Sequence, residues 1–289
     1  MEDFKQFCRV ITAPIVFIQN HFKAVMLVLI VSLFVFATPQ QQTMTNLYRI
    51  ELYGPILEAD SFLRQVKAAG DERIKGVLLV VDSPGGSVPP SVEMMMALKK
   101  LAEQKPVVAY SAGVMASGSY YASVWSNEII ANPGSIVGSI GVIMEGFNAA
   151  DLLDKLGVKM RVVKAGDLKE AGTFYREWTA SEKAQLEAVV GETYKMFVAD
   201  VAAARDLSAA DHKSFADGRV FTASQALEVG LIDSLGSIET AQARVVELSG
   251  VKDPFWNEKS EFDKVLERLE QGAQTAVVKL FATTIKSQL

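Results

Sequence analysis

Residues 74–88 read "IKGVLLVVDSPGGSV", and this stretch determines the fold class. Its apolar run at 76–81 has no alternating polar positions and ends at a turn that contains Gly85 and Gly86. A run of this length without polar alternation predicts a strand that is buried on both faces of a sheet. Strands of this kind occur in parallel sheets, where crossover helices cover both faces.

Short apolar runs and amphipathic helices continue on both sides of this stretch. We predict strands at 47–56, 74–84, 106–113, 127–135, 137–144 and 156–166, and helices at 59–70, 89–103 and 117–124. Beyond residue 166 the chain is mostly helical, with capping boxes "TASE" at 179–182 and "TASQ" at 222–225; the second helix ends at Gly230. The sequence therefore predicts an α/β protein.

The composition excludes several classes of function. With 289 residues, 49% of them apolar, the chain can bury a sizeable core in one large domain or two small ones. A net charge of −5 offers no basic surface to bind nucleic acid. Cys8 is the only cysteine, so neither a disulfide framework nor a cysteine metal site can be built. We expect no metal and no cofactor.

The N-terminal region has the pattern of a membrane anchor. An uncharged apolar run at 24–38 is closed by Pro39, and Lys5, Arg9 and Lys23 precede it. The run is short for a spanning helix, but the charge asymmetry predicts a single pass with a cytoplasmic N-terminus. The rest of the chain would lie outside an inner or plasma membrane, in the periplasm or the exterior. A cleaved signal peptide with its cleavage site near 35–37 is the alternative.

These features divide the chain into four parts. We expect a cytoplasmic segment at 1–23, a transmembrane anchor at 24–40, an α/β domain at 41–250 and a C-terminal extension at 251–289. The extension carries one apolar helical stripe between 260 and 289. An amphipathic helix there would pack on its own domain or on a sister subunit. The membrane surface is the weaker alternative, because the polar face is not strongly basic.

Three glycine-marked turns, each following a predicted strand, are the candidate site. Gly85 and Gly86 expose backbone N–H groups that can face a developing oxyanion. Ser117 lies where a strand gives way to a helix, and there the helix dipole and the N–H of Gly118 favour negative charge. Ser139 lies in the third turn, "VGSIGV". Taken alone, Gly85 and Gly86 favour an ordinary strand-to-helix turn.

A serine attacks only if a base takes its proton. His21 precedes the expected membrane segment, and His212 lies in a polar stretch typical of a loop. A lysine is the alternative, provided that burial lowers the lysine pKa from about 10.4 towards 7. Lys169, which lies between two glycines in "KAGDLKEAG", is the first candidate and Lys164 the second.

Five motifs together resemble the signal peptide peptidase A (SppA) family of membrane-bound serine proteases, of the S49 type. They are "DSPGG", "MASGSYY", "GSIGV", "KAGDLKEAG" and "FADGRVFTASQALEVGLID", in this order between about residues 50 and 235. The resemblance implies a ClpP/crotonase-like fold with repeated ββα units for the protease domain. It also implies catalysis by a serine–lysine dyad on hydrophobic peptides such as signal-peptide remnants.

The resemblance assigns roles to the candidate residues. The family's nucleophile falls on Ser117 and its general base on Lys169. The serine that orients the lysine amine falls on Ser139. The oxyanion donors would be the N–H groups of Gly118 and of the Gly85–Gly86 turn. The resemblance further implies a homo-oligomeric ring, an octamer, in which neighbouring subunits share each site.

The chain also departs from the family pattern. Ser119 occupies a place where a second glycine is common, Val80 one where arginine is common, and Phe174 one where proline is common. These departures leave the substrate pocket and the subfamily open, including the related SohB-type peptidases. Three rival interpretations of the chain are a crotonase-like enzyme of the same fold, an inactive membrane-anchored scaffold and a sister peptidase that acts on other exported proteins, the last being the strongest.

Overall fold

The structure is a computed structural model, which describes residues 21–24, 26–27 and 45–257. The chain divides into two units between Met44 and Thr45, and the fold below is that of the second unit. Among the described residues there is no helix with the length and apolar character that a membrane crossing requires. Most of the predicted anchor at 24–40 lies outside the described residues, as do residues 258–289 of the predicted C-terminal extension.

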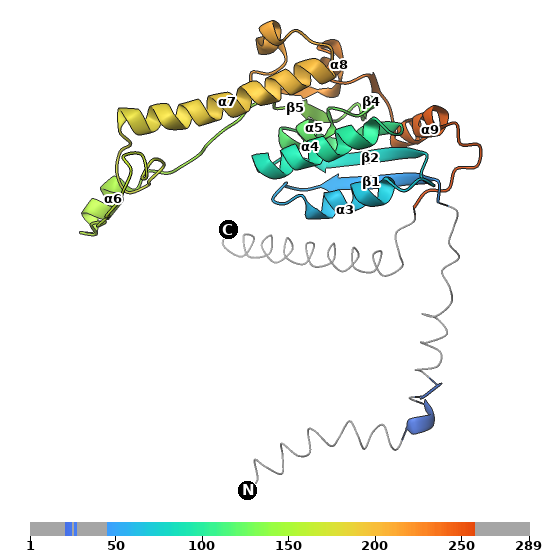
Figure 1. The fold of residues 1–289 in the computed structure, drawn as a ribbon, viewed down its shortest axis with the longest axis horizontal. Helices are drawn as coiled ribbons and strands as arrows, with labels where there is room; N and C mark the ends of the chain where they lie inside the picture. Colours follow the sequence, from blue (N-terminus) through green and yellow to red (C-terminus); the bar gives the residue numbers. More distant parts are fainter. Residues whose placement is uncertain (1–20, 25, 28–44, 258–289) are drawn as a thin grey trace, which may run out of the picture. The chain divides into compact units, whose positions relative to one another are not determined.

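The second unit contains a sheet of seven strands (Figure 1). The strands are β1 (Leu47–Tyr53), β2 (Gly76–Ser83), β3 (Val107–Ala116), β4 (Glu128–Ala131), β5 (Ile136–Gly138), β6 (Val220–Thr222) and β7 (Ser234–Leu235). The helices are α3 (Asp60–Ala69), α4 (Val88–Ala102), α5 (Gly118–Ser123), α6 (Ala150–Lys155), α7 (Ala180–Ala204), the 3-10 helix η1 (Ala209–Ser214), α8 (Ala223–Glu228) and α9 (Ile238–Ser249).

The sheet is mostly parallel. Its main path is β1-β2-β3-β4-β7, in which all neighbours are parallel. β3 changes its partner along its length, because residues 108–111 pair with β4 and residues 114–116 pair with β5. β5 in turn pairs antiparallel with β6. β3 and β5 thus run side by side as far as Ala116, the residue before Ser117.

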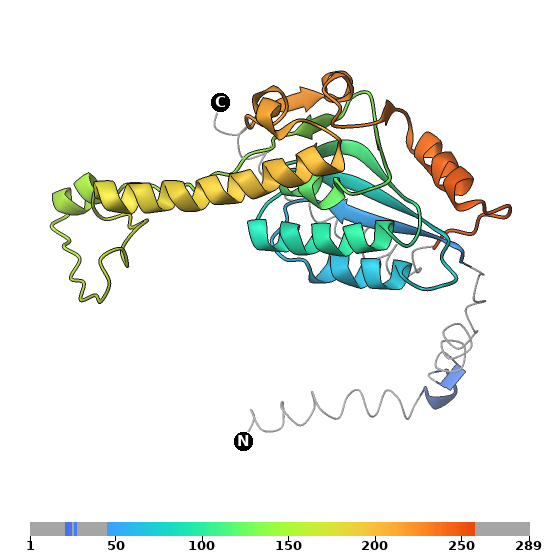
Figure 2. The same ribbon diagram turned by 45° about the horizontal axis from the view of Figure 1, so that its top comes forward.

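The run at 76–81 is buried on both faces, as its sequence predicts. Leu79 and Val81 belong to the core on the side of α3, α4 and α5, whereas Leu78 and Val80 belong to the core formed with α9. Alternate residues of a strand point to opposite faces, so a strand covered on both sides has no polar positions left. Figure 2 shows α3 and α4 on one side of the sheet and α9 on the other.

Most predicted elements are confirmed. The helices expected at 59–70, 89–103 and 117–124 correspond to α3, α4 and α5. Both capping boxes form, with Thr179 and Thr222 at the N-caps of α7 and α8. The turn that follows α8 contains Gly230, whose φ of 79° favours glycine. The strand expected at 137–144 is shorter, because β5 ends at Gly138.

The strand predicted at 156–166 is wrong. These residues follow α6 and belong to no strand, and their apolar side chains, Val163 above all, are exposed. Alternating β-branched residues favour a strand only when a sheet edge and a packed face are present, and the described part of this chain offers neither to the segment. We call residues 142–178 the arm. Figure 1 shows α6 near the end of α7 that is remote from the sheet.

The arm exposes an unusual number of large apolar side chains. They are Ile143, Met144, Phe147, Leu152, Leu156, Val158, Met160, Val162, Val163, Leu168 and Phe174. Single exposed apolar residues are ordinary, but such a concentration on one segment marks an interaction surface.

The contrast between the buried strand and the arm is testable. Leu79→Ala is expected to lower the free energy of unfolding by about 2–5 kcal/mol, because it leaves a cavity in the centre of the sheet. In dilute, monomeric protein, Val163→Ala, a control on the exposed arm, is expected to change it by less than about 0.5 kcal/mol. Denaturant unfolding measures both. Similar losses for the two variants would mean that the arm is buried in the isolated chain.

Candidate active site

The first two glycine-marked turns touch each other. Gly85 has φ of 88°, and a Cβ atom added to it would lie 2.5 Å from the backbone nitrogen of Gly118 and 2.9 Å from the Cβ of Ser117. A Cβ added to Gly118 would lie 2.2 Å from the Oγ of Ser91. Neither position has room for a side chain. The two glycines therefore let the carboxyl end of β2 contact the start of α5.

Ser117 has a strained backbone. It follows the last residue of β3 with φ of 53° and ψ of −123°, a combination that costs a non-glycine residue about 1–3 kcal/mol. Its N–H donates to the carbonyl oxygen of Gly138 at 2.8 Å. Strain of this kind is typical of sharp strand-to-helix turns that present a nucleophilic serine. It marks Ser117 as a candidate functional residue.

The third turn adjoins the same place. Gly138 has φ of 103° and Ser139 has φ of 49°, and the N–H of Ser139 donates to the carbonyl oxygen of Arg219 at 2.8 Å. Since the preceding carbonyl binds Ser117, Ser139 is held beside the candidate nucleophile by backbone bonds alone. The three turns that the sequence singled out thus converge at the carboxyl ends of β2, β3 and β5.

Two backbone N–H groups beside Ser117 are available as donors. The bridge between Ile56 and Gly86 uses the N–H of Ile56, which donates to Gly85, and the N–H of Ser87, which donates to Ile56. Within the described residues, the N–H groups of Gly86 and Gly118 have no acceptor. Such donors can stabilise an oxyanion. α5 has only six residues, so these N–H groups matter more than the helix dipole invoked from the sequence.

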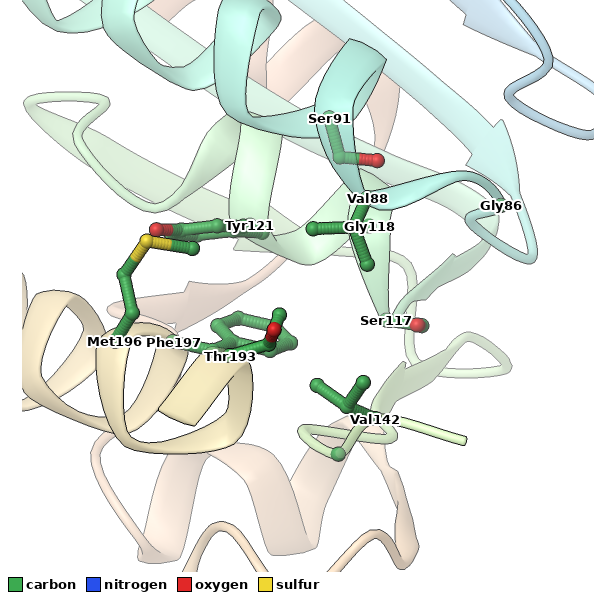
Figure 3. A pocket seen from close by; sticks show the side chains of 11 residues that line it. Gly86, Val88, Ser91, Ser117, Gly118, Tyr121, Val142, Thr193, Met196 and Phe197 are labelled. Carbon is green, nitrogen blue, oxygen red and sulfur yellow. The ribbon is translucent and has the colours of Figure 1, made fainter. Parts of the chain in front are cut away.

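A hollow lies beside Ser117 and Gly118. Its wall is largely apolar, with Val88, Tyr121, Val142, Met196 and Phe197 as the large lining side chains. Figure 3 shows Ser117 at one edge of the hollow and the side chains of α7 at the opposite edge. Such a hollow suits an apolar side chain of a peptide.

The hydroxyl of Tyr121 faces away from bulk solvent at this wall. It donates a hydrogen bond to Asp200 of α7, and its ring packs against Phe197 with ring centroids 4.4 Å apart. Burial, and secondarily this bond, raise the pKa of Tyr121 well above its usual value of 10. Tyr121 is therefore uncharged near neutral pH, and it lines the hollow rather than acting as a base.

No candidate base lines this hollow within the described residues. Lys169 lies exposed on the arm, and its amine has no hydrogen-bond or ion-pair partner in the described part of the chain. Lys164 differs, because its Nζ lies 2.6 Å from a carboxylate oxygen of Glu170. His212 is half-buried in η1, where its Nδ1 lies 3.1 Å from the carbonyl oxygen of Ala209. The structure thus brings the serines and glycines together without Lys169, Lys164 or His212.

Ser119 has a structural role that the sequence did not reveal. Its buried Oγ accepts the N–H of Ala116 at 2.9 Å and lies 2.7 Å from the carbonyl oxygen of Ser83. It therefore ties the end of β2 to the end of β3 directly behind Ser117. The departure from glycine at this position adds a hydrogen-bonding group to the turn.

The residues that α7 contributes were also missed. Thr193, Met196 and Phe197 line the hollow although they lie more than 70 positions after Ser117. The only signal in the sequence was the capping box at 179–182, which predicts where a helix starts but not what its faces contact.

The family of the chain follows from its similarity to known proteins. Residues 99–252 match the model of peptidase family S49. The chain belongs to this family. As an S49 member it is a serine peptidase similar to SppA, which confirms the resemblance seen in the sequence.

Two relatives and one solved structure show the extent of the similarity. "Putative protease slr0021" of Synechocystis sp. is 40% identical over 225 residues, which cover 77% of this chain and 80% of that protein. "Serine protease SPPA, chloroplastic" of Arabidopsis thaliana is 31% identical over 192 residues, or 66% of this chain and 28% of that one. A mutant of the 1510-N membrane-bound stomatin-specific protease matches with a TM-score of 0.51 over 75% of this chain and 99% of its own, at 16% identity, and supports the α/β fold.

Because the two turns are in contact, a methyl group added at Gly85 is expected to destabilise the fold. Gly85→Ala is expected to lower the free energy of unfolding by about 1–3 kcal/mol more than Gly54→Ala does. Both glycines have positive φ, so both variants carry the same kind of backbone strain, but only the site at 85 lacks space for a Cβ atom. Denaturant unfolding compares them. Equal losses would show that the turns are not in contact.

Proposed function

We propose that this S49 peptidase is a serine endopeptidase with Ser117 as nucleophile and Lys169 as general base. One observation carries the proposal: a strained serine adjoins an apolar hollow and two N–H groups that have no acceptor among the described residues. A membrane anchor at 24–40 would hold the domain, with the ClpP/crotonase-like fold that the sequence implies, on the non-cytoplasmic side. Its substrates would be hydrophobic peptides such as signal-peptide remnants.

The reaction would be acyl transfer. The Oγ of Ser117 forms a bond to the carbonyl carbon of the peptide while the neutral amine of Lys169 takes the hydroxyl proton. The resulting oxyanion accepts hydrogen bonds from the N–H groups of Gly86 and Gly118. The C–N bond then breaks, and the lysine returns the proton to the leaving amine. Water, activated by the same lysine, hydrolyses the acyl-enzyme and restores Ser117.

The lysine would come from a second copy of the chain. In the single chain the amine of Lys169 is exposed and outside the hollow, yet a lysine base must be desolvated to be neutral. Docking of the arm onto the neighbouring copy would bury the amine beside Ser117, where Ser139 would orient it. A ring of identical subunits, an octamer in the proposal, repeats this contact around its axis.

The arm has the properties of such an interface. Its exposed apolar side chains would be covered in the assembly, and residues 158–164, which belong to no strand here, would find a partner strand. The hollow beside Ser117 supports a preference for an apolar side chain at the substrate position next to the cleaved bond.

The dyad and its sharing are tested with one set of full-length proteins. Ser117→Ala and Lys169→Ala are each expected to reduce hydrolysis of a fluorogenic apolar peptide at least about 1,000-fold, because each removes a reacting group. A one-to-one mixture of the two variants is expected to recover part of the activity, since mixed assemblies contain sites with both residues intact.

The outcomes separate the parts of the proposal. Full activity of Lys169→Ala would show that another group, Lys164 or His212, is the base. Two inactive variants whose mixture stays inactive would keep the dyad but contradict its sharing. A wild-type protein that cleaves no peptide in a broad panel would instead support an inactive scaffold.

The proposed interface predicts that assembly and activity are lost together. Val163→Asp places a charge on the most exposed apolar side chain of the arm, so it is expected to dissociate the oligomer and to lower activity at least about tenfold. Leu248→Asp, on α9, is the matched control and is expected to leave both unchanged. Analytical ultracentrifugation and the peptide assay measure the two properties. A dissociated but fully active variant would contradict the shared site.

A further inference from the structure

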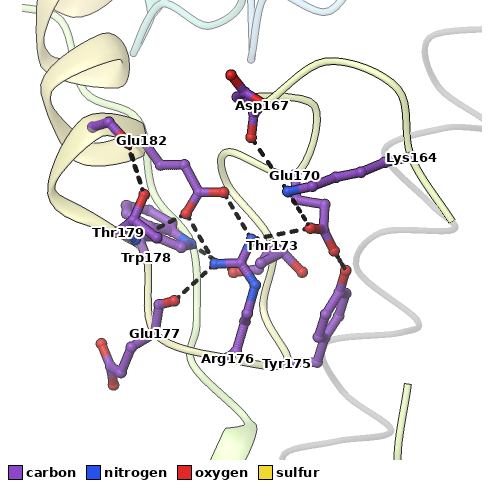
Figure 4. Close-up of polar contacts among 11 residues, drawn as sticks. Lys164, Asp167, Glu170, Thr173, Tyr175, Arg176, Glu177, Trp178, Thr179 and Glu182 are labelled. Atoms are coloured by element: carbon purple, nitrogen blue, oxygen red, sulfur yellow. Dashed lines mark hydrogen bonds and ion pairs between the residues drawn. The ribbon is translucent and has the colours of Figure 1, made fainter. Parts of the chain in front are cut away.

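Glu170, the residue after Lys169, is held by three neighbouring side chains (Figure 4). One oxygen of its carboxylate lies 2.6 Å from the Nζ of Lys164 and 3.3 Å from the Nη2 of Arg176. The hydroxyl of Tyr175 donates to the other oxygen. These bonds, that of Lys164 first, lower the pKa of Glu170 to about 2. The carboxylate is therefore ionised throughout the neutral pH range.

Arg176 carries the network on to α7. Its Nη2 lies 2.7 Å from one oxygen of Glu182 and its Nη1 lies 2.9 Å from the other, so the pair is bidentate. Glu182 is buried, and it also accepts the N–H of Thr179 at 2.9 Å as part of the capping box. The Arg176 bonds, and then the Thr179 bond, lower the pKa of Glu182 to about 2. The arm is thus fastened to the first turn of α7.

α7 joins this fastening point to the active site. The helix continues from Glu182 to Phe197, which lines the hollow beside Ser117, over about 22 Å at 1.5 Å per residue. Its last turns are anchored in the core through Val198 and Val201. A single helix therefore connects the backbone around Lys169 with the wall of the hollow.

We infer, on the basis of the proposed function, that Glu170, Arg176 and Glu182 are positioning residues for the lysine base. They fix the backbone that carries Lys169 relative to α7. They also keep the neighbouring Lys164 in an ion pair and leave the amine of Lys169 unengaged. Positioning of this kind affects the rate strongly, because a displacement of about 1 Å can cost 100-fold in catalysis.

The alternative is a purely structural role, in which the ion network only caps α7. A cap contributes to stability, so its loss would lower activity only as far as it lowers the folded fraction. A positioning role instead lowers kcat in protein that remains folded, with little effect on KM. The effect would also be confined to the chain that supplies the lysine.

The test uses full-length protein and Arg176→Ala, with Arg176→Lys as the conservative variant. Arg176→Ala is expected to lower kcat about 10–100-fold with KM within about threefold, and Arg176→Lys is expected to recover part of the loss. Lys183→Ala is the control, because it breaks an exposed ion pair with Glu187 on the same helix. Circular dichroism on heating shows the folded fraction of each variant.

The activity recovered in mixed assemblies distinguishes positioning of the lysine from a role in stability alone. Arg176→Ala is combined either with Ser117→Ala, in the chain that supplies the lysine, or with Lys169→Ala, in the chain that supplies the serine. Recovered activity is expected to fall only in the first combination. Equal losses in both would overturn the inference, as would wild-type kcat in Arg176→Ala or a loss that matches the folded fraction.

The same series distinguishes a failure of the proposed function. If Lys169→Ala retains wild-type activity, the lysine is not the base and the inference fails with the proposed function. If Lys169→Ala is inactive and Arg176→Ala is fully active, the positioning inference alone is overturned.

Discussion

The site depends on one close approach, that of the backbone at Gly85 to the backbone at Ser117 and Gly118. The carboxyl ends of two parallel strands come together there with no side chain between them. In the described part of the chain the N–H groups of Gly86 and Gly118 have no acceptor at this contact, and Ser117 adopts a conformation that few serines adopt. The free energy stored in that backbone is offset by the buried sheet behind it, in which β2 is covered on both faces.

The sheet and the arm contribute different parts of the proposed site. The sheet supplies the serine turns and one wall of the hollow, and both are complete within a single chain. The arm carries Lys169 and the largest concentration of exposed apolar side chains among the described residues, and within those residues neither is covered. The ion network at Glu170, Arg176 and Glu182 joins the two regions through α7, so the backbone that carries Lys169 is connected to one wall of the hollow.

Much of this could be predicted from the sequence, for a physical reason in each case. The unbroken apolar run at 76–81 specified a strand covered on both faces, and the capping boxes at Thr179 and Thr222 specified two helix starts, because both signals are local. The prediction failed at 156–166, where alternation indicated a strand whose partner does not lie within the described chain. The serine and glycine turns were found because each follows a strand end. The α7 residues of the hollow were not, since only the tertiary fold brings Phe197 to Tyr121.

The separation of the serine from the lysine has a consequence for regulation. If the base arrives only when the arm of another copy docks, a newly made chain carries a nucleophile that nothing can deprotonate. Such a chain is harmless to its surroundings while it is dilute, and it needs no inhibitory propeptide. Proteolysis would then start at a threshold of local concentration.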